Sequence, residues 1–177
     1  MSSRFERLAA RTVFEGAIVD VCEGTFRHED GEVVTRQWVV HPGSVGIVAH
    51  DGERVWLVRQ PREATGDADL LELPAGKLDE EGESPLECGQ RELAEEIGKA
   101  AEHWEHLTTY FTSAGFTNET CHLYLATGLR DEPGHRIADE RIDIDPVPLA
   151  ELDATIAGCR DAKTLIGLLI LRDRLRG

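Results

Sequence analysis

Residues 84–98 carry the signals that begin and end a single helix. Ser84 is an N-cap residue, Pro85 stands at the first helical position, and Glu87 lies three residues after the cap, a pattern that predicts a capping box. Gly98 is typical of the residue that ends a helix. The sequence therefore predicts one helix over residues 85–97.

The faces of this helix differ in chemistry. Three apolar side chains share one face within roughly 40° and are predicted to meet the core: Leu86, Leu93 and Ile97. Glu92 and Glu96 lie side by side at i and i+4, with Glu95 one step around the helix. Carboxylates this close repel one another by a few tenths of a kcal/mol per pair, roughly, and a divalent cation reverses the sign of that interaction. The alternative is a solvated face on which Arg91 pairs with Glu87 and Glu95.

Short apolar runs separated by turn residues predict strands on both sides of this helix. Before it they cover residues 12–21, 25–28, 33–40, 44–49, 54–59 and 70–73, and after it residues 106–111, 120–126 and 142–147. A last helix is predicted from Asp161, as its N-cap, to Arg176, and we assign it to core packing without chemistry. The pattern predicts an α/β fold in which a small antiparallel β-unit, residues 1–41, precedes a domain over residues 42–177.

The charge of the chain limits its partners. The 177 residues include 41% hydrophobic side chains, enough for one domain with a buried core. Asp and Glu number 34 against 19 Lys and Arg, which gives a formal charge of -15 that repels the backbone of DNA or RNA. We therefore expect no nucleic-acid partner, and we expect a phosphate-bearing small molecule to bind through divalent cations.

The remaining composition favours a cytoplasmic protein with no membrane partner. Residues 1–10 carry charges where a signal peptide needs an apolar run, and no stretch approaches the roughly 18 apolar residues of a membrane span. The four cysteines form no CxxC pair, so neither a zinc site nor a disulfide framework is expected. Adaptation to a salty cytoplasm stays open as a reason for the acidic charge.

The stretch from Gly76 to Gly98 resembles the Nudix box, the signature of the Nudix hydrolase family. The family pattern continues from a glutamate, here Glu83, through seven residues to Arg-Glu, an aliphatic, any residue, Glu-Glu, any residue and Gly, and residues 91–98 match it as RELAEEIG. Two positions depart from it: six residues rather than five separate Gly76 from Glu83, and Lys99 stands where an aliphatic is usual. The resemblance implies a Nudix α/β/α sandwich with a mixed sheet.

The resemblance also implies roles for individual residues. The implied ligands of Mg²⁺, with Mn²⁺ as a substitute, are the carbonyl of Ala75 and the side chains of Glu92, Glu95 and Glu96. The implied catalytic residues are Glu83, Arg91, Glu95 and, as general base in the loop 130–141, Glu140. The alternatives are a simple surface ion pair for Glu83 and Arg91, and a plain loop charge for Glu140. The glycines at 76 and 82 are expected to adopt backbone conformations closed to other residues.

Segments outside the box resemble the ADP-ribose and ADP-sugar pyrophosphatases of this family. These are residues 41–43 (HPG), 59–62 (RQPR), 72–76 (ELPAG) and 113–119 (SAGFTNE). The substrate-binding residues that follow from this likeness are Arg36, Arg62, Glu72 and Gly115, with the two arginines on adenine or phosphates, partly across a homodimer interface. Ala114 stands where those enzymes usually have proline.

The function implied is Mg²⁺-dependent hydrolysis of the pyrophosphate bond of ADP-ribose or a related nucleoside diphosphate sugar, giving AMP and a sugar phosphate. GDP-mannose, NADH or an oxidised nucleoside triphosphate stays open as the substrate, because all these Nudix enzymes share the box. A non-catalytic Nudix domain that senses a nucleotide is the alternative from another class. Sensors typically lose box glutamates, and Glu92, Glu95 and Glu96 are all present.

Overall fold

The computed structural model describes residues 4–132 and 141–177, which form two compact units. The first unit runs from the N-terminus to Pro42 and includes Phe111–Thr120. The second comprises Gly43–Tyr110 and Cys121–Gly177.

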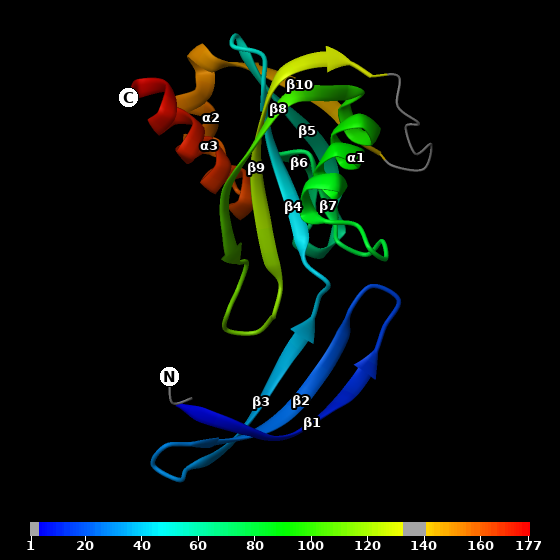
Figure 1. The fold of residues 1–177 in the computed structure, drawn as a ribbon, viewed down its shortest axis with the longest axis vertical. Coiled ribbons are helices and arrows are strands. Elements are labelled where there is room, and N and C mark those ends of the chain that lie inside the picture. The colour runs from blue at the N-terminus through cyan, green and yellow to red at the C-terminus, as the bar shows by residue number, and fades with distance from the viewer. Residues whose placement is uncertain (1–3, 133–140) are drawn as a thin grey trace. The chain divides into compact units, whose positions relative to one another are not determined.

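The first unit is built on an antiparallel sheet in the order β1-β2-β3 (Figure 1). Its strands are β1 (Phe5–Glu15), β2 (Asp20–His28) and β3 (Val33–Val40). The strand predicted over residues 12–21 is wrong, because the chain turns between β1 and β2, where the amide of Gly16 donates to Oδ1 of Asp20 at 3.2 Å. Every residue of β1 is exposed, so no apolar period marks the first half of that strand.

The motif segment 113–119 is tied to β3 within this unit. The Val39 amide donates to the Phe116 carbonyl at 2.8 Å, and the His41 amide donates to Oδ1 of Asn118 at 2.9 Å. Val39 and Thr117 form an isolated parallel bridge. Two segments more than 70 residues apart in the sequence are thus joined by backbone hydrogen bonds and by the Asn118 side chain.

The second unit is a mixed sheet between two layers of helices. The strands are β4 (Ser44–His50), β5 (Arg54–Arg62), β6 (Asp67–Glu72), β7 (Ala75–Lys77), β8 (Lys99–Phe111), β9 (Thr120–Asp131) and β10 (Asp143–Pro148). The helices are α1 (Pro85–Ile97), α2 (Leu152–Gly158) and α3 (Ala162–Arg176), with short 3₁₀ turns η1 (Glu63–Thr65) and η2 (Leu149–Glu151).

The strand order is β10-β5-β4-β9-β8, with β6 beside β5 and β7 beside β4. β4 and β9 run parallel, whereas β4 is antiparallel to β5 and β7. Helix α1 lies on one side of the sheet and α2 and α3 lie on the other (Figure 1). The α/β/α sandwich with a mixed sheet is therefore confirmed.

Strand β4 supplies side chains to both hydrophobic cores. Ile47 packs in the cluster that contains Leu93 of α1, while Val48 packs in the cluster that contains Leu168 of α3. A Cβ atom at Gly167 of α3 would lie 2.8 Å from Cγ2 of Val48, so the glycine allows α3 to approach the sheet closely. This close approach brings the first turn of α3 to the end of β6, where Lys163 bonds to Glu72 and Thr164 accepts from the Leu73 amide.

Helices were easier to predict than strand ends. The limits of α1 are confirmed at Pro85 and Ile97, and α3 begins after its N-cap Asp161 as predicted. Strand β8 begins at Lys99 rather than at residue 106, and β9 extends to Asp131 rather than ending at residue 126. The added stretches carry no buried residue, so no apolar pattern in the sequence predicted them. The strand β7 and the helix α2 are additions to the prediction. No helix among the described residues is long and apolar enough to span a membrane.

Candidate active site

The capping box of α1 fixes where the box glutamates lie. The hydroxyl of Ser84 accepts from the Glu87 amide at 3.3 Å, and Oε2 of Glu87 accepts from the Ser84 amide at 2.9 Å. Gly98, with φ 65°, ends the helix. Glu87 is thus engaged in the cap, and the neighbouring Arg91 turns to other carboxylates.

Arg91 gathers three glutamates around one guanidinium. Its Nε and Nη2 donate to the two carboxylate oxygens of Glu83 at 2.9 and 3.0 Å, and Nη1 donates to Glu92 at 2.8 Å and to Glu95 at 3.0 Å. The hydrogen bonds to Glu83 raise the pKa of Arg91, and the same bonds lower the pKa of Glu83. The guanidinium therefore favours the ionised form of Glu83 and holds the three carboxylates close together.

Two glutamates of α1, Glu92 and Glu96, reach the short strand β7. A Cβ atom built on Gly76 would lie 2.0 Å from Oε1 of Glu92, so only glycine leaves room for that carboxylate. The Ala75 amide donates to Oε2 of Glu96 at 3.1 Å, and Glu96 is 6% exposed. Gly82 has φ 84° as predicted, but the role predicted for Gly76 is wrong, because the space beside Glu92 and not a left-handed backbone requires that glycine.

The donor atoms fit a hard divalent cation. Mg²⁺ prefers oxygen ligands, and carboxylates of Glu92, Glu95 and Glu96 lie on one helix, two of them against the segment that carries the Ala75 carbonyl. Over residues 4–132 and 141–177, no three acidic, histidine or cysteine side chains already surround one point as a metal group would. Arg91 now takes the oxygens of Glu92 and Glu95, so a bound metal would share these carboxylates with the guanidinium.

Arg62 and Glu72, both predicted to bind substrate, bind each other. Nε and Nη2 of Arg62 donate to the two oxygens of Glu72 at 2.5 and 2.8 Å. The Glu72 side chain is 1% exposed, and burial alone would raise its pKa, but Arg62 and Lys163 outweigh burial and lower it. The hydrogen bonds to Glu72 raise the pKa of Arg62, and the charge of Glu96 adds to that effect. The side chain of Arg62 is 43% exposed, and it lies close enough to Glu96, a predicted metal ligand, for that charge to raise the pKa of Arg62.

The first turn of α3 completes this ion pair, which sequence reasoning missed. The ammonium of Lys163 bonds to Oε2 of Glu72 and lies 3.1 Å from Asp161. The hydroxyl of Thr164 accepts from the Leu73 amide at 2.7 Å and donates to Asp161 at 2.6 Å. A partly buried lysine has no spacing signature, and the one signal available was that Lys163 is among only three lysines in the chain.

Three other predicted residues belong to the first unit or fall outside the described residues. Arg36 belongs to the first unit, where its guanidinium donates to the Thr35 carbonyl at 2.9 Å, and Gly115 belongs to the same unit. Glu140 lies outside the described residues. The roles of these three residues stay predictions.

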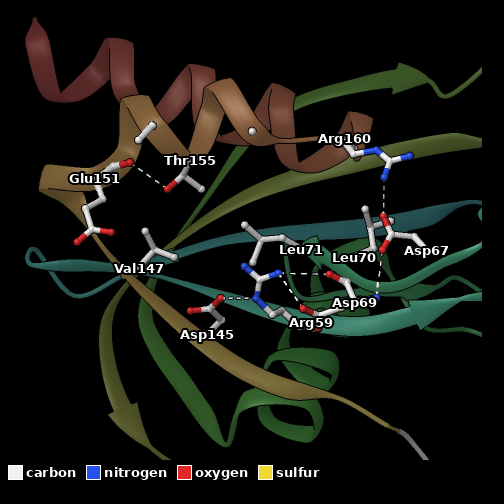
Figure 2. A pocket seen from close by; sticks show the side chains of 12 residues that line it. Arg59, Asp67, Asp69, Leu70, Leu71, Asp145, Val147, Glu151, Thr155 and Arg160 are labelled. Carbon is white, nitrogen blue, oxygen red and sulfur yellow. Dashed lines mark hydrogen bonds and ion pairs between the residues drawn. The ribbon is translucent and has the colours of Figure 1, made fainter.

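A hollow of about 460 Å³ lies where β5, β6 and β10 meet α2, and Val147 of the α3-side core lines it. Figure 2 shows Arg59 between Asp145 and Asp69, with Nε of Arg59 2.6 Å from Asp145. Arg160 pairs with Asp67 at 3.0 Å, and both residues also line this hollow. Arg59 therefore differs from Arg62 of the same RQPR segment, because Arg59 pairs with two aspartates that line this hollow, whereas Arg62 pairs with Glu72.

Known proteins are similar to this chain in sequence and in fold. The NUDIX domain model matches residues 40–165. An ADP-ribose pyrophosphatase of Mycobacterium tuberculosis is 40% identical over 148 residues, which is 81% of this chain and 71% of that protein. A methanol dehydrogenase activator of Bacillus methanolicus is 34% identical over 179 residues, 97% of this chain and 96% of the other.

Two further likenesses concern the substrate and the fold. A GDP-mannose pyrophosphatase of Cronobacter sakazakii is 34% identical over 163 residues, 84% of this chain and 83% of that protein. The crystal structure of an ADP compounds hydrolase superposes with a TM-score of 0.87 at 22% identity, covering 99% of this chain and 96% of the other. The last likeness concerns the fold alone.

The chain belongs to the Nudix family, and it is a Nudix hydrolase. The box motif, the sandwich fold and the relatives agree on this assignment. Its relatives support hydrolysis of a nucleotide-sugar pyrophosphate as the type of reaction.

Proposed function

We propose that this protein hydrolyses the pyrophosphate bond of ADP-ribose, or of a related nucleoside diphosphate sugar, with Mg²⁺, releasing AMP and a sugar phosphate. The observation that carries the proposal is the cluster of box glutamates beside Ala75 and Gly76. Arg62 lies near this cluster, since the charge of Glu96 raises the pKa of Arg62. ADP-ribose is preferred because the relative that is 40% identical is named an ADP-ribose pyrophosphatase.

The residues divide the work as follows in this proposal. Mg²⁺, when bound, would supply positive charge to neutralise the pyrophosphate oxygens and would make water at the site a stronger acid. Glu92, Glu95, Glu96 and the Ala75 carbonyl hold the metal, while Arg91, anchored by Glu83, keeps Glu92 and Glu95 in place.

Two residues act on the substrate itself. Arg62 binds the phosphates, because its planar group is fixed by Glu72 and still partly exposed. Glu140 is the proposed general base, a role that adds about 10²- to 10⁴-fold to the rate in enzymes that use one.

The first unit is proposed to form a homodimer with a second copy of this chain, and Arg36 and Gly115 are proposed to contact substrate there. The unit exposes large apolar side chains, including Phe5 at 51% and Phe14 at 58% on β1 and Ile18 at 75% in the turn between β1 and β2. Its outer strand β1 has one neighbour in that sheet. Light scattering should give twice the 19.6 kDa mass of the chain. The mass of a monomer at the protein concentration used in the activity assays would contradict the dimer.

Rates with three substrates test the proposed function. The purified protein is incubated with Mg²⁺ and ADP-ribose, GDP-mannose or NADH, and the released nucleoside monophosphate is measured. We expect ADP-ribose to be cleaved fastest, with AMP as product. Faster cleavage of GDP-mannose would move the assignment to the substrate named for the Cronobacter relative. Binding of ADP-ribose without cleavage of any substrate would support the nucleotide sensor and overturn the proposal.

A further inference from the structure

The first turn of α3 closes a ring of polar contacts on the end of β6. Glu72 binds Lys163, Lys163 lies against Asp161, Asp161 accepts from Thr164, and Thr164 accepts from the amide of Leu73, the residue after Glu72. Glu72, Leu73 and Thr164 are all at most 1% exposed. The ring therefore joins a helix to a strand that lies 91 residues earlier in the chain.

This ring fixes the chain segment that leads to the proposed metal ligand. The side chain of Glu72 and the amide of Leu73 are held by α3, the Pro74 carbonyl accepts from the Ile47 amide at 2.9 Å, and the Ala75 amide donates to Glu96. Four successive residues are thus each anchored. Ala75 is left with little freedom to move relative to α1.

The ring also fixes Arg62. Both oxygens of Glu72 receive hydrogen bonds from Arg62, and Oε2 receives a further one from Lys163. A buried carboxylate with two cations in different directions has one favourable orientation, and its orientation sets the plane of the bidentate guanidinium. Without Lys163, the carboxylate and the half-exposed guanidinium can rotate together.

We propose that Lys163 is a positioning residue for substrate binding, which acts through Glu72 to orient the guanidinium of Arg62 toward the phosphates. Asp161 and Thr164 hold Lys163 and the segment after Glu72 in the matching position. The proposal rests on the proposed function, since it concerns how that site grips a nucleoside diphosphate. Lys163 itself touches Glu72 and Asp161 and is not proposed to touch substrate.

Three variants of α3 test the role of Lys163. Lys163→Met keeps the length of the side chain and removes its charge, Lys163→Arg restores a cation, and Arg174→Met removes a surface ion pair with Glu105 from the same helix as the control. We expect Lys163→Met to raise KM by about tenfold, the size typical of losing a residue that orients a ligand, with kcat changed by less than about twofold. Lys163→Arg should recover most of that loss, and Arg174→Met should leave KM unchanged.

A double-mutant cycle with Arg62→Ala separates positioning from a general effect on the fold. If Lys163 acts through Arg62, adding Lys163→Met to Arg62→Ala should change KM by less than about twofold. The inference would be overturned if the KM of the double variant rose by the product of the two single-variant increases. An unchanged KM in folded Lys163→Met would overturn it as well. If Lys163→Met does not fold, the variant Glu72→Gln/Lys163→Met, which removes both charges, takes its place in the same cycle.

The wild type separates the two proposals. The cycle is measured on whichever of ADP-ribose, GDP-mannose and NADH the wild type cleaves fastest. Cleavage by the wild type with multiplied effects in the cycle would overturn the role of Lys163 alone. No cleavage of any of the three would overturn the proposed function, and the role of Lys163 with it.

Discussion

Two charged clusters of this protein, one around Arg91 and one around Glu72, differ in how their partners are spaced along the chain. Arg91 binds glutamates one, four and eight residues away, so one helix turn and the loop before it create that cluster. Glu72 binds Arg62 ten residues away and Lys163 91 residues away, so that cluster exists only once α3 has packed on the sheet. The first depends on local structure and the second on the completed fold.

The clusters also differ in exposure. The side chains of Arg91 and Glu95 are 30% and 23% exposed, whereas that of Glu72 is 1% exposed. A partly exposed carboxylate can exchange one cation for another, but a buried one must keep its partners. We therefore expect changes in the Arg91 cluster to affect metal-dependent catalysis first, and changes in the Glu72 cluster to affect substrate binding and stability.

The largest expected effect is that of Glu96→Gln. The change removes the charge of a proposed metal ligand and keeps its shape, so kcat/KM should fall by more than about 100-fold. Glu87→Gln is the matched control on α1, because glutamine also serves in a capping box. Thermal melts are expected to show that both variants fold. Equal activity of the two variants would place the metal somewhere other than beside Ala75.

Arg91→Met should have the next largest effect. Without the guanidinium, Glu83, Glu92 and Glu95 lose their shared partner and repel one another, so activity should fall by about 10- to 100-fold. Arg91→Lys, which keeps the charge but not the fork, should lie between this variant and the wild type. Full activity of Arg91→Met would mean that its ion pairs are ordinary surface pairs.

Gly76→Ala should weaken metal binding and leave the fold intact. The added Cβ would lie 2.0 Å from Oε1 of Glu92, so the carboxylate must move, and the Mg²⁺ concentration for half-maximal rate should rise by about tenfold. Gly158→Ala is the control, since no atom lies within 4 Å of a Cβ there. An unchanged Mg²⁺ requirement would separate Glu92 from the metal.

Thr164→Val tests the α3 cluster through stability. The change keeps the volume but leaves the buried Leu73 amide without its acceptor, which should cost about 1–3 kcal/mol in the free energy of unfolding. Urea denaturation measures this loss. Thr155→Val on α2, where the hydroxyl donates to the Glu151 carbonyl within its own helix turn, should cost less. Equal losses would argue that the ring is no tighter than a surface contact.

The smallest effect concerns pH. Because Arg62 and Lys163 lower the pKa of Glu72 below its ordinary value of 4.5, the ionised side chain stabilises the fold above that pH, and this contribution is lost as the pH falls through the lowered pKa. Each unit of lowering corresponds to about 1.4 kcal/mol. Glu72→Gln should therefore lose less stability than the wild type between pH 7 and pH 3, and an identical loss would show that other carboxylates account for acid unfolding.

Sequence reasoning predicted best where contacts are local. The capping box, the end of α1 at Gly98 and the grouping of Glu92, Glu95 and Glu96 follow from spacing along one helix. The family resemblance added the sandwich fold, which is confirmed, and the assignment of Ala75 as a metal ligand, which stays a prediction. No spacing within the helix could give either.

The sequence could not show contacts that depend on packing. The partner of Glu72 on α3 is 91 residues away and is set by how closely Gly167 lets that helix approach the sheet. The need for Gly76 could be read as backbone freedom because the side chain that fills its space comes from α1. Lys99, which departs from the family pattern, packs its ammonium 4.3 Å from the ring of Trp56 and pairs with Asp131, both distant in sequence.

The most direct measurement is the rate of AMP release from ADP-ribose by the wild-type protein before chelation of divalent ions, after it, and after Mg²⁺ is added back. Glutamates on α1 that gather a metal beside Ala75 predict loss of cleavage on chelation and its return with Mg²⁺. Cleavage that continues unchanged in excess chelator would contradict that account.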